Sequence, residues 1–204
     1  GVWDLLARGP RRAAQRELIA DAIGPIWEAN HVWLILAVVL LFTCFPPAFA
    51  RLTVMLHIPL ALALVGIVLR GSAFTFRSYD SRRDAVQRRW GAVFAGASVI
   101  TPLLLGVCVG AIATGRLGGN HSGFIATYVT PWLNPFTAAV GCMTLALFAF
   151  LAAVYLTVEA GDPALKDDFR RRALWSAGAT IALAAAAIPL AGHGAPRMYA
   201  ALTG

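Results

Sequence analysis

The sequence predicts an all-α membrane protein, a polytopic bundle of about five transmembrane helices. Of the 204 residues, 59% are apolar and 13% are charged, and the mean hydropathy is +0.70. A soluble domain of this size cannot hide so much apolar surface in one core. The apolar residues form long runs, and the arginines gather in short clusters between them. A bilayer is therefore the expected solvent.

Residues 1–24 are expected to form a cytoplasmic segment that lies on the membrane surface. Within residues 10–23 the apolar side chains recur at helical spacing and basic side chains lie opposite, as in an interfacial helix. Gly24-Pro25 then breaks or kinks the chain. The segment has neither an initiating methionine nor a signal-peptide pattern. We therefore expect the chain to be a piece of a longer protein.

The helix bundle is expected over residues 25–195, followed by a periplasmic end at 196–204. A helix needs about 20 residues to cross a hydrocarbon core of about 30 Å. The first four apolar runs exceed this length, which predicts tilt, and the fifth is near the lower limit. The expected spans are residues 25–49, 52–74, 91–115, 134–160 and 174–190.

The 17 Lys and Arg residues alternate along the chain in a way that predicts its orientation. Segment by segment they number 4, 1, 6, 1, 4 and 1, and the rich segments are cytoplasmic under the positive-inside rule. The net charge of +7 is therefore an orientation signal. No basic face interleaved with exposed aromatic residues is visible, so nucleic acid is not an expected partner. The connectors expected outside carry one arginine each: Arg51, Arg116 and Arg197.

The first expected span contains the main candidates for chemistry. Glu28 lies one turn after Pro25, and His31 follows on the same helix face, so a proton could pass between them. Glu28 could equally be a first-turn carboxylate that favours the positive end of the helix dipole and reaches water. Asn30 is costly in lipid unless it bonds a neighbouring helix. Together with Trp27 and Trp33 it implies protein on several sides of this helix.

Two further polar residues lie within the second expected span, and each has two interpretations. His57 is either a packing histidine or a haem ligand, although a haem held by two histidines needs a second one at matching depth. Arg70 either extends to the membrane surface or neutralises a buried carboxylate such as Glu28.

Other kinds of site receive little support from the sequence. The three cysteines lie singly inside apolar runs, which is typical of small apolar side chains and not of a metal site or disulfide framework. No phosphate-binding loop, HExxH or nucleophile elbow is present. Glycines in the third span are expected to permit close helix packing.

One segment resembles a known family. The run Ile23-Gly-Pro-Ile-Trp27-Glu28-Ala-Asn30-His31-Val-Trp33-Leu-Ile35 is similar to the signature helix of subunit II of cytochrome bd-type quinol oxidases. The similarity continues through Arg70-Gly-Ser-Ala-Phe-Thr-Phe-Arg77-Ser, Trp90, Thr101-Pro-Leu-Leu-Leu-Gly106 and Leu133-Asn134-Pro135-Phe136. It covers most of the chain and is strongest in the first 80 residues.

This resemblance implies roles for several residues. Glu28 matches an acidic residue on a proton route from the cytoplasm near the subunit interface, with His31 as a weaker member. Trp33 matches a tryptophan beside the route of oxygen. Trp27, Asn30, Arg70, Arg77 and Asn134 match structural or interface positions. Some family members have glutamine at the place of His31 and lysine at the place of Tyr79.

The resemblance also implies cofactors, partners and location. Subunit II binds no haem or metal, and haems b558, b595 and d lie in a haem-bearing subunit I, which oxidises quinol and reduces oxygen to water. The expected partners are that subunit, membrane lipid and quinone, with small accessory subunits left open, in the bacterial inner membrane. Against the family pattern, the chain lacks the first and the last two transmembrane helices. The alternatives are a proton-coupled transporter subunit and a membrane b-type cytochrome.

Overall fold

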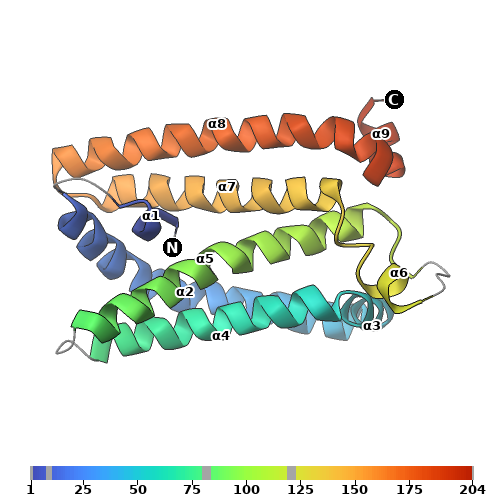
Figure 1. Ribbon diagram of the computed structural model, residues 1–204, viewed down its shortest axis with the longest axis horizontal. Helices are drawn as coiled ribbons and strands as arrows, with labels where there is room; N and C mark the ends of the chain where they lie inside the picture. The colour runs from blue at the N-terminus through green and yellow to red at the C-terminus, as the bar shows by residue number, and fades with distance from the viewer. Residues whose placement is uncertain (1, 8–10, 80–83, 119–122, 204) are drawn as a thin grey trace.

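The computed structural model describes residues 2–7, 11–79, 84–118 and 123–203, and within them every regular element is an α-helix. Side chains 23–31, 74, 77–79, 84–88, 202 and 203 lie outside the description. Figure 1 shows long helices running side by side. The predicted all-α bundle is confirmed. The helices are α1 (Val2–Leu5), α2 (Arg12–Cys44), α3 (Pro46–Met55), α4 (His57–Tyr79), α5 (Asp84–Ala113), α6 (Phe124–Tyr128), α7 (Pro135–Glu159), α8 (Pro163–Gly194) and α9 (Pro196–Thr203).

Four long helices form the packed part of the bundle, in the order α4, α5, α7 and α8. The backbones of α5 and α7 approach closely where small residues face each other. A Cβ built on Gly106 of α5 would lie 2.9 Å from the Cα of Gly141 of α7. Small residues permit such approaches, which drive helix association in lipid by van der Waals packing. Of the three glycines expected to permit close packing, Gly106 and Gly110 lie at this contact, whereas Gly115 follows the end of α5 and has nothing within 4 Å of its built Cβ.

The helix α2 continues through Gly24-Pro25 and ends at Cys44. Pro46 and Pro47 open α3, because proline has no N–H to extend the preceding helix but fits a first helical turn. Residues Val32–Cys44 and α3 are bent by 115° relative to each other. Residues 45–49, which the sequence placed in the first span, thus lie outside α2, and Arg51 lies in α3 and not in a simple turn.

Among the described residues, three helical segments are long and apolar enough to cross a membrane: Arg89–Ala113, Pro135–Glu159 and Pro163–Gly194. The segments Val32–Cys44 and Pro46–Met55 meet the same criterion when they are taken together, despite the bend between them. The described apolar part of α4, His57–Ala73, is too short to meet it. The expected spans in α2 and α4 remain predictions.

The segment before the first expected span packs against the bundle. Trp3, Ile19 and Phe169 belong to one apolar cluster that joins α1 and the start of α2 to α7 and α8. The indole N–H of Trp3 donates to the Ala149 carbonyl over 2.7 Å. We call this end of the bundle the α1 end. The opposite end, at which α3, α6 and α9 lie, is called the α3 end (Figure 1).

Candidate functional site

The helix α2 carries the segment that the sequence marked as functional. Residues 23–31 are helical in their backbone, which agrees with the expected spacing of Glu28 and His31. The side chains of Trp27, Glu28, Asn30 and His31 lie outside the described residues. Their proposed roles therefore remain predictions from sequence.

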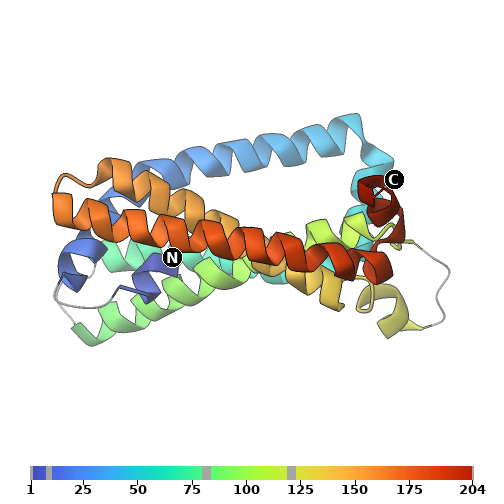
Figure 2. The same cartoon turned by 90° about the horizontal axis from the view of Figure 1, so that it is seen from above.

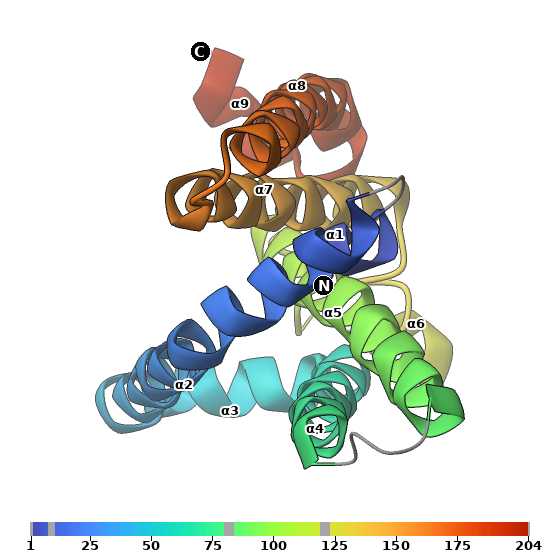
Figure 3. The same ribbon diagram turned by 90° about the vertical axis from the view of Figure 1, so that its left-hand side faces the viewer.

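The described half of α2 that follows is uncovered. Residues 32–44 are all exposed except Leu41, which is half-buried, and Trp33 is 68% exposed. Figures 2 and 3 show this part of α2 running apart from α8. Because the side chains around the helix are exposed on every face, the rest of the described chain gives this stretch almost no protein neighbour.

Arg70 lies at the contact between α4 and α5. The carbon at the centre of its guanidinium is 5.7 Å from the centroid of the Phe94 ring, within the range of a cation–π interaction. Its Nε atom is buried and has no hydrogen-bond partner among the side chains that the structure describes. A buried guanidinium N–H without a partner is costly, so Arg70 is a donor available for a carboxylate.

The aromatic residues near Arg70 fasten the same two helices together. Phe76 of α4 and Trp90 of α5 stack with ring centroids 4.7 Å apart. Both residues belong to segments on which the family resemblance depends, and the structure brings them together. The side chain of Arg77 lies outside the described residues.

Asn134 begins α7 as its N-cap. Its side-chain oxygen accepts from the Thr137 backbone N–H over 3.0 Å, and the Asn134 backbone N–H donates to the Thr137 hydroxyl over 3.2 Å. The amide nitrogen donates to the Pro131 carbonyl over 3.1 Å. These bonds satisfy groups that a helix start otherwise leaves unpaired, which gives the residue a local structural role.

A polar cluster at the α1 end was not identified from the sequence. Arg11 donates to both carboxylate oxygens of Asp168, over 3.0 and 2.7 Å. Gln15 donates to Asp168 over 3.0 Å and accepts from Arg172 over 2.8 Å. No sequence spacing connects residues that lie more than 150 positions apart, and the only available signal was the presence of aspartates among the basic residues of the later segment.

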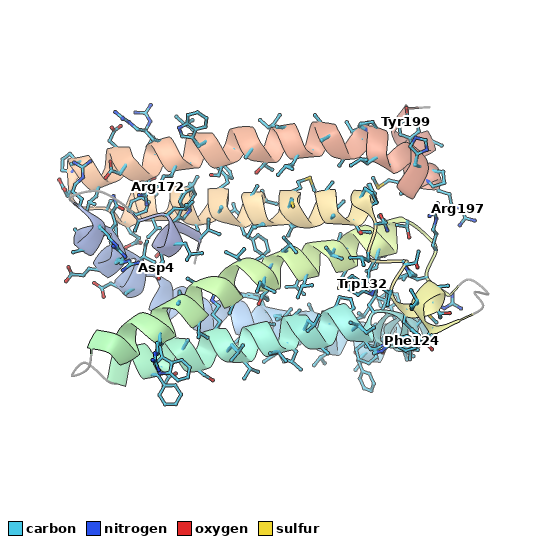
Figure 4. All side chains as sticks on the ribbon, viewed as in Figure 1. Asp4, Phe124, Trp132, Arg172, Arg197 and Tyr199 are labelled. Carbon is cyan, nitrogen blue, oxygen red and sulfur yellow. The ribbon has the colours of Figure 1, made fainter. Side chains whose placement is uncertain are left out.

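The second part of this cluster surrounds Asp4 (Figure 4). Asp4 is 4% exposed, and one of its carboxylate oxygens lies 3.3 Å from Nε of Arg16. The guanidinium of Arg172 lies over the rings of Trp3 and Phe169, at 5.6 and 5.1 Å. The charges of α1, α2 and α8 thus pair with one another and fix the start of the chain to the bundle.

The charged pair between Arg11 and Asp168 precedes the apolar part of α8. Burial raises the pKa of the Asp168 carboxyl, but hydrogen bonds from Arg11 and Gln15 outweigh it, so the pKa is lowered overall. The same contact raises the pKa of Arg11. The ion pair is therefore fully formed near neutral pH.

His57 lies at the α3 end, where α4 begins. Its Nδ1 is 2.8 Å from the Val54 carbonyl oxygen, and its ring meets the Tyr128 ring edge-on with centroids 5.1 Å apart. Both contacts suit a packing histidine. Among the described residues no group of three or more His, Cys, Asp or Glu could hold a metal ion.

Comparison with known proteins gives consistent similarities. A family model described as cytochrome bd terminal oxidase subunit II matches residues 1–203. The chain is 29% identical over 137 residues to cytochrome bd ubiquinol oxidase subunit 2 of Bacillus subtilis, covering 67% of this chain and 39% of that protein. The chain is also 29% identical over 154 residues to cytochrome bd-I ubiquinol oxidase subunit 2 of Escherichia coli K12. This match covers 73% of this chain and 40% of that protein.

A third relative covers more of the chain. It is a probable cytochrome oxidase subunit 2 of Haemophilus influenzae, 29% identical over 189 residues, which are 91% of this chain and 49% of that protein. The chain thus spans less than half the length of these curated relatives.

Proposed function

The chain belongs to the cytochrome bd terminal oxidase subunit II family, and from this premise we propose that it is the non-haem subunit of a quinol-oxidising, oxygen-reducing membrane enzyme. It catalyses nothing alone and packs against a haem-bearing subunit I. The names of the relatives, which are ubiquinol oxidase subunits, support quinol as the substrate of the complex. The proposed location is the bacterial cytoplasmic membrane.

The uncovered half of α2 is the observation that carries this proposal. Lipid can solvate the apolar residues 32–44, which are exposed or half-buried. It cannot satisfy the polar residues Glu28, Asn30 and His31 that the sequence places on the same helix. A helix of this composition needs protein beside it. We therefore place the contact with subunit I along α2, with Trp33 beside the route of oxygen.

Proton uptake is proposed to begin at Glu28. A carboxylate at a helix interface can load and release a proton, whereas a neighbouring arginine favours its charged form. Arg70 supports this pairing because its buried Nε finds no hydrogen-bond partner within the described part of the chain. The arginine distribution supports a cytoplasmic α1 end, so a route through Glu28 and, more weakly, His31 draws protons from the cytoplasm.

The haems are assigned to the partner and not to this chain. By family resemblance, haems b558, b595 and d lie in subunit I and supply the electron transfer and oxygen chemistry. His57, the one histidine of an expected span whose side chain the structure describes, has its Nδ1 beside the Val54 carbonyl and lies against Tyr128. These contacts favour packing over haem ligation.

The test is to purify the tagged full-length subunit from membranes and to record the haem spectrum and quinol-dependent oxygen uptake of what copurifies. We expect a haem-bearing partner and oxygen uptake. Recovery of the subunit alone, without haem and without a partner, would contradict the proposal. If haem copurifies, a His57→Ala variant that loses it would favour a b-type cytochrome instead.

A further inference from the structure

The charges of this chain are segregated between the two ends of the bundle. None of the ten acidic residues falls in residues 33–79, 85–158 or 169–204. The three connectors at the α3 end, residues 45–56, 114–134 and 195–204, therefore contain no carboxylate side chain. Each of them carries one arginine: Arg51, Arg116 and Arg197.

The fold brings these arginines to the α3 end of the bundle. The side chain of Arg51 lies against the loop after α5, because a Cβ built on Gly118 would be 3.6 Å from its Cδ and Nε atoms. Arg116 belongs to the same loop and donates to the His193 carbonyl over 3.0 Å. Arg197 follows four residues later, at the start of α9. The loop after α5 thus contacts Arg51 and carries Arg116, and Arg197 lies at the same end of the bundle in the connector after α8 (Figure 4).

The guanidinium groups remain available to an external anion. All three arginines are exposed, and no Asp or Glu in these connectors can neutralise them. At the α1 end, by contrast, Arg11 is paired with Asp168 and Arg171 with Asp167. A guanidinium fork matches the geometry of a phosphate.

Exposed apolar side chains accompany the arginines. Phe124 is 61%, Ile125 69% and Leu133 65% exposed. Figure 4 shows Arg197, Trp132 and Phe124 at the same end of the bundle. Tryptophan and tyrosine are typical of the level of the lipid headgroups. The acyl chains of a phospholipid would cover these exposed apolar side chains, whereas a water-soluble acidic protein would leave them uncovered.

From this charge and this apolar surround we propose that the α3 end binds the phosphate groups of anionic phospholipids through Arg51, Arg116 and Arg197. The inference requires only that the chain lies in a bilayer, and it does not depend on the proposed oxidase activity. It assigns a role to the single arginine of each outer connector.

The test compares lipids retained by the purified complex, reconstituted in equal mixtures of phosphatidylglycerol and phosphatidylcholine. Mass spectrometry measures the ratio of the two lipids after extraction into detergent. In the variant R51Q/R116Q/R197Q we expect the excess of phosphatidylglycerol to fall about threefold or more. The control R12Q/K166Q/R170Q removes the same charge from exposed positions at the other end and should keep most of the excess.

Two results would overturn the proposal. One is an equal retention of phosphatidylglycerol by wild type and R51Q/R116Q/R197Q. The other is loss of the partner subunit with lipid retention unchanged, which would assign the arginines to an acidic protein surface. If the triple variant does not fold, R197Q alone removes a side chain that is exposed at the start of α9. It should lower retention measurably, and unchanged retention would contradict the proposal.

Discussion

Replacing Gly106 by alanine tests whether α5 and α7 depend on the close approach of their backbones. The added Cβ would lie 2.5 Å from the Thr144 hydroxyl oxygen, 2.6 Å from the Thr144 Cβ and 2.9 Å from the Cα of Gly141. Ordinary contacts begin at 3.4 Å. The helices must therefore separate by up to roughly 1 Å, with loss of dispersion contacts along the interface.

The expected cost follows from two opposing effects. Overpacking of a tight contact destabilises by about 1–3 kcal/mol, and exchanging glycine for alanine inside a helix stabilises by about 1 kcal/mol. Gly96 lies in the same helix and has no atom within 4 Å of its built Cβ. Gly96→Ala should therefore show the gain in helix propensity without any overpacking. The free energies of unfolding of the two variants should differ by about 1–3 kcal/mol.

The assay is thermal unfolding of the purified complex in one detergent, followed by the fraction that remains monodisperse. We expect Gly96→Ala to match or exceed wild type and Gly106→Ala to unfold several degrees lower. Equal midpoints for the two variants would refute the inferred backbone contact between α5 and α7, because helix propensity is the same in both.

Three further predictions follow from the site and its surroundings. Glu28→Gln should slow oxygen uptake while the haem spectrum and assembly stay intact. Unchanged turnover across pH would contradict a role in proton uptake and would favour the alternative, a first-turn carboxylate that is hydrated at the membrane surface. Asn134→Ala should destabilise by about 1 kcal/mol through loss of the N-cap, measured by the same thermal assay, with Asn134→Ser as a control that retains a capping oxygen. The ion pair of Arg11 and Asp168 should stabilise above the ordinary carboxyl pKa and lose its effect as pH falls through the lowered pKa of Asp168. Arg11→Gln should therefore lower stability near neutral pH, and this loss should shrink steadily as the pH falls below the ordinary carboxyl pKa. A loss of the same size at neutral and at strongly acidic pH would exclude the ion pair as its cause.

The class of fold and the long helices could be predicted because length and hydropathy are local properties. The apolar runs of α5, α7 and α8 each consist of consecutive residues. The end of α2 could not be placed to the residue, because a run of apolar residues continues across the break. The prolines at 46 and 47 turn the chain by 115° while hydropathy stays high. Hydropathy reports solvent preference and not backbone direction.

The candidate site was predictable where a motif lies in one helix and hidden where its parts are distant. Trp33 and Glu28 share α2, so their spacing predicts a common segment. The bonds of Gln15 to Asp168 and of Arg172 to Gln15 join α2 to α8, so they arise only after these two helices have come together. No period within a helix encodes such contacts.

The sequence by itself determined that this protein is a helical membrane bundle of a recognisable family, because composition, run length and arginine placement are properties of the chain without its fold. Only the tertiary structure decided which surfaces remain uncovered. It left residues 32–44 of α2 almost without protein neighbours and brought Arg51 beside the loop that carries Arg116. Exposure and proximity depend on how separate segments pack, and packing is set by contacts between residues that the sequence keeps far apart.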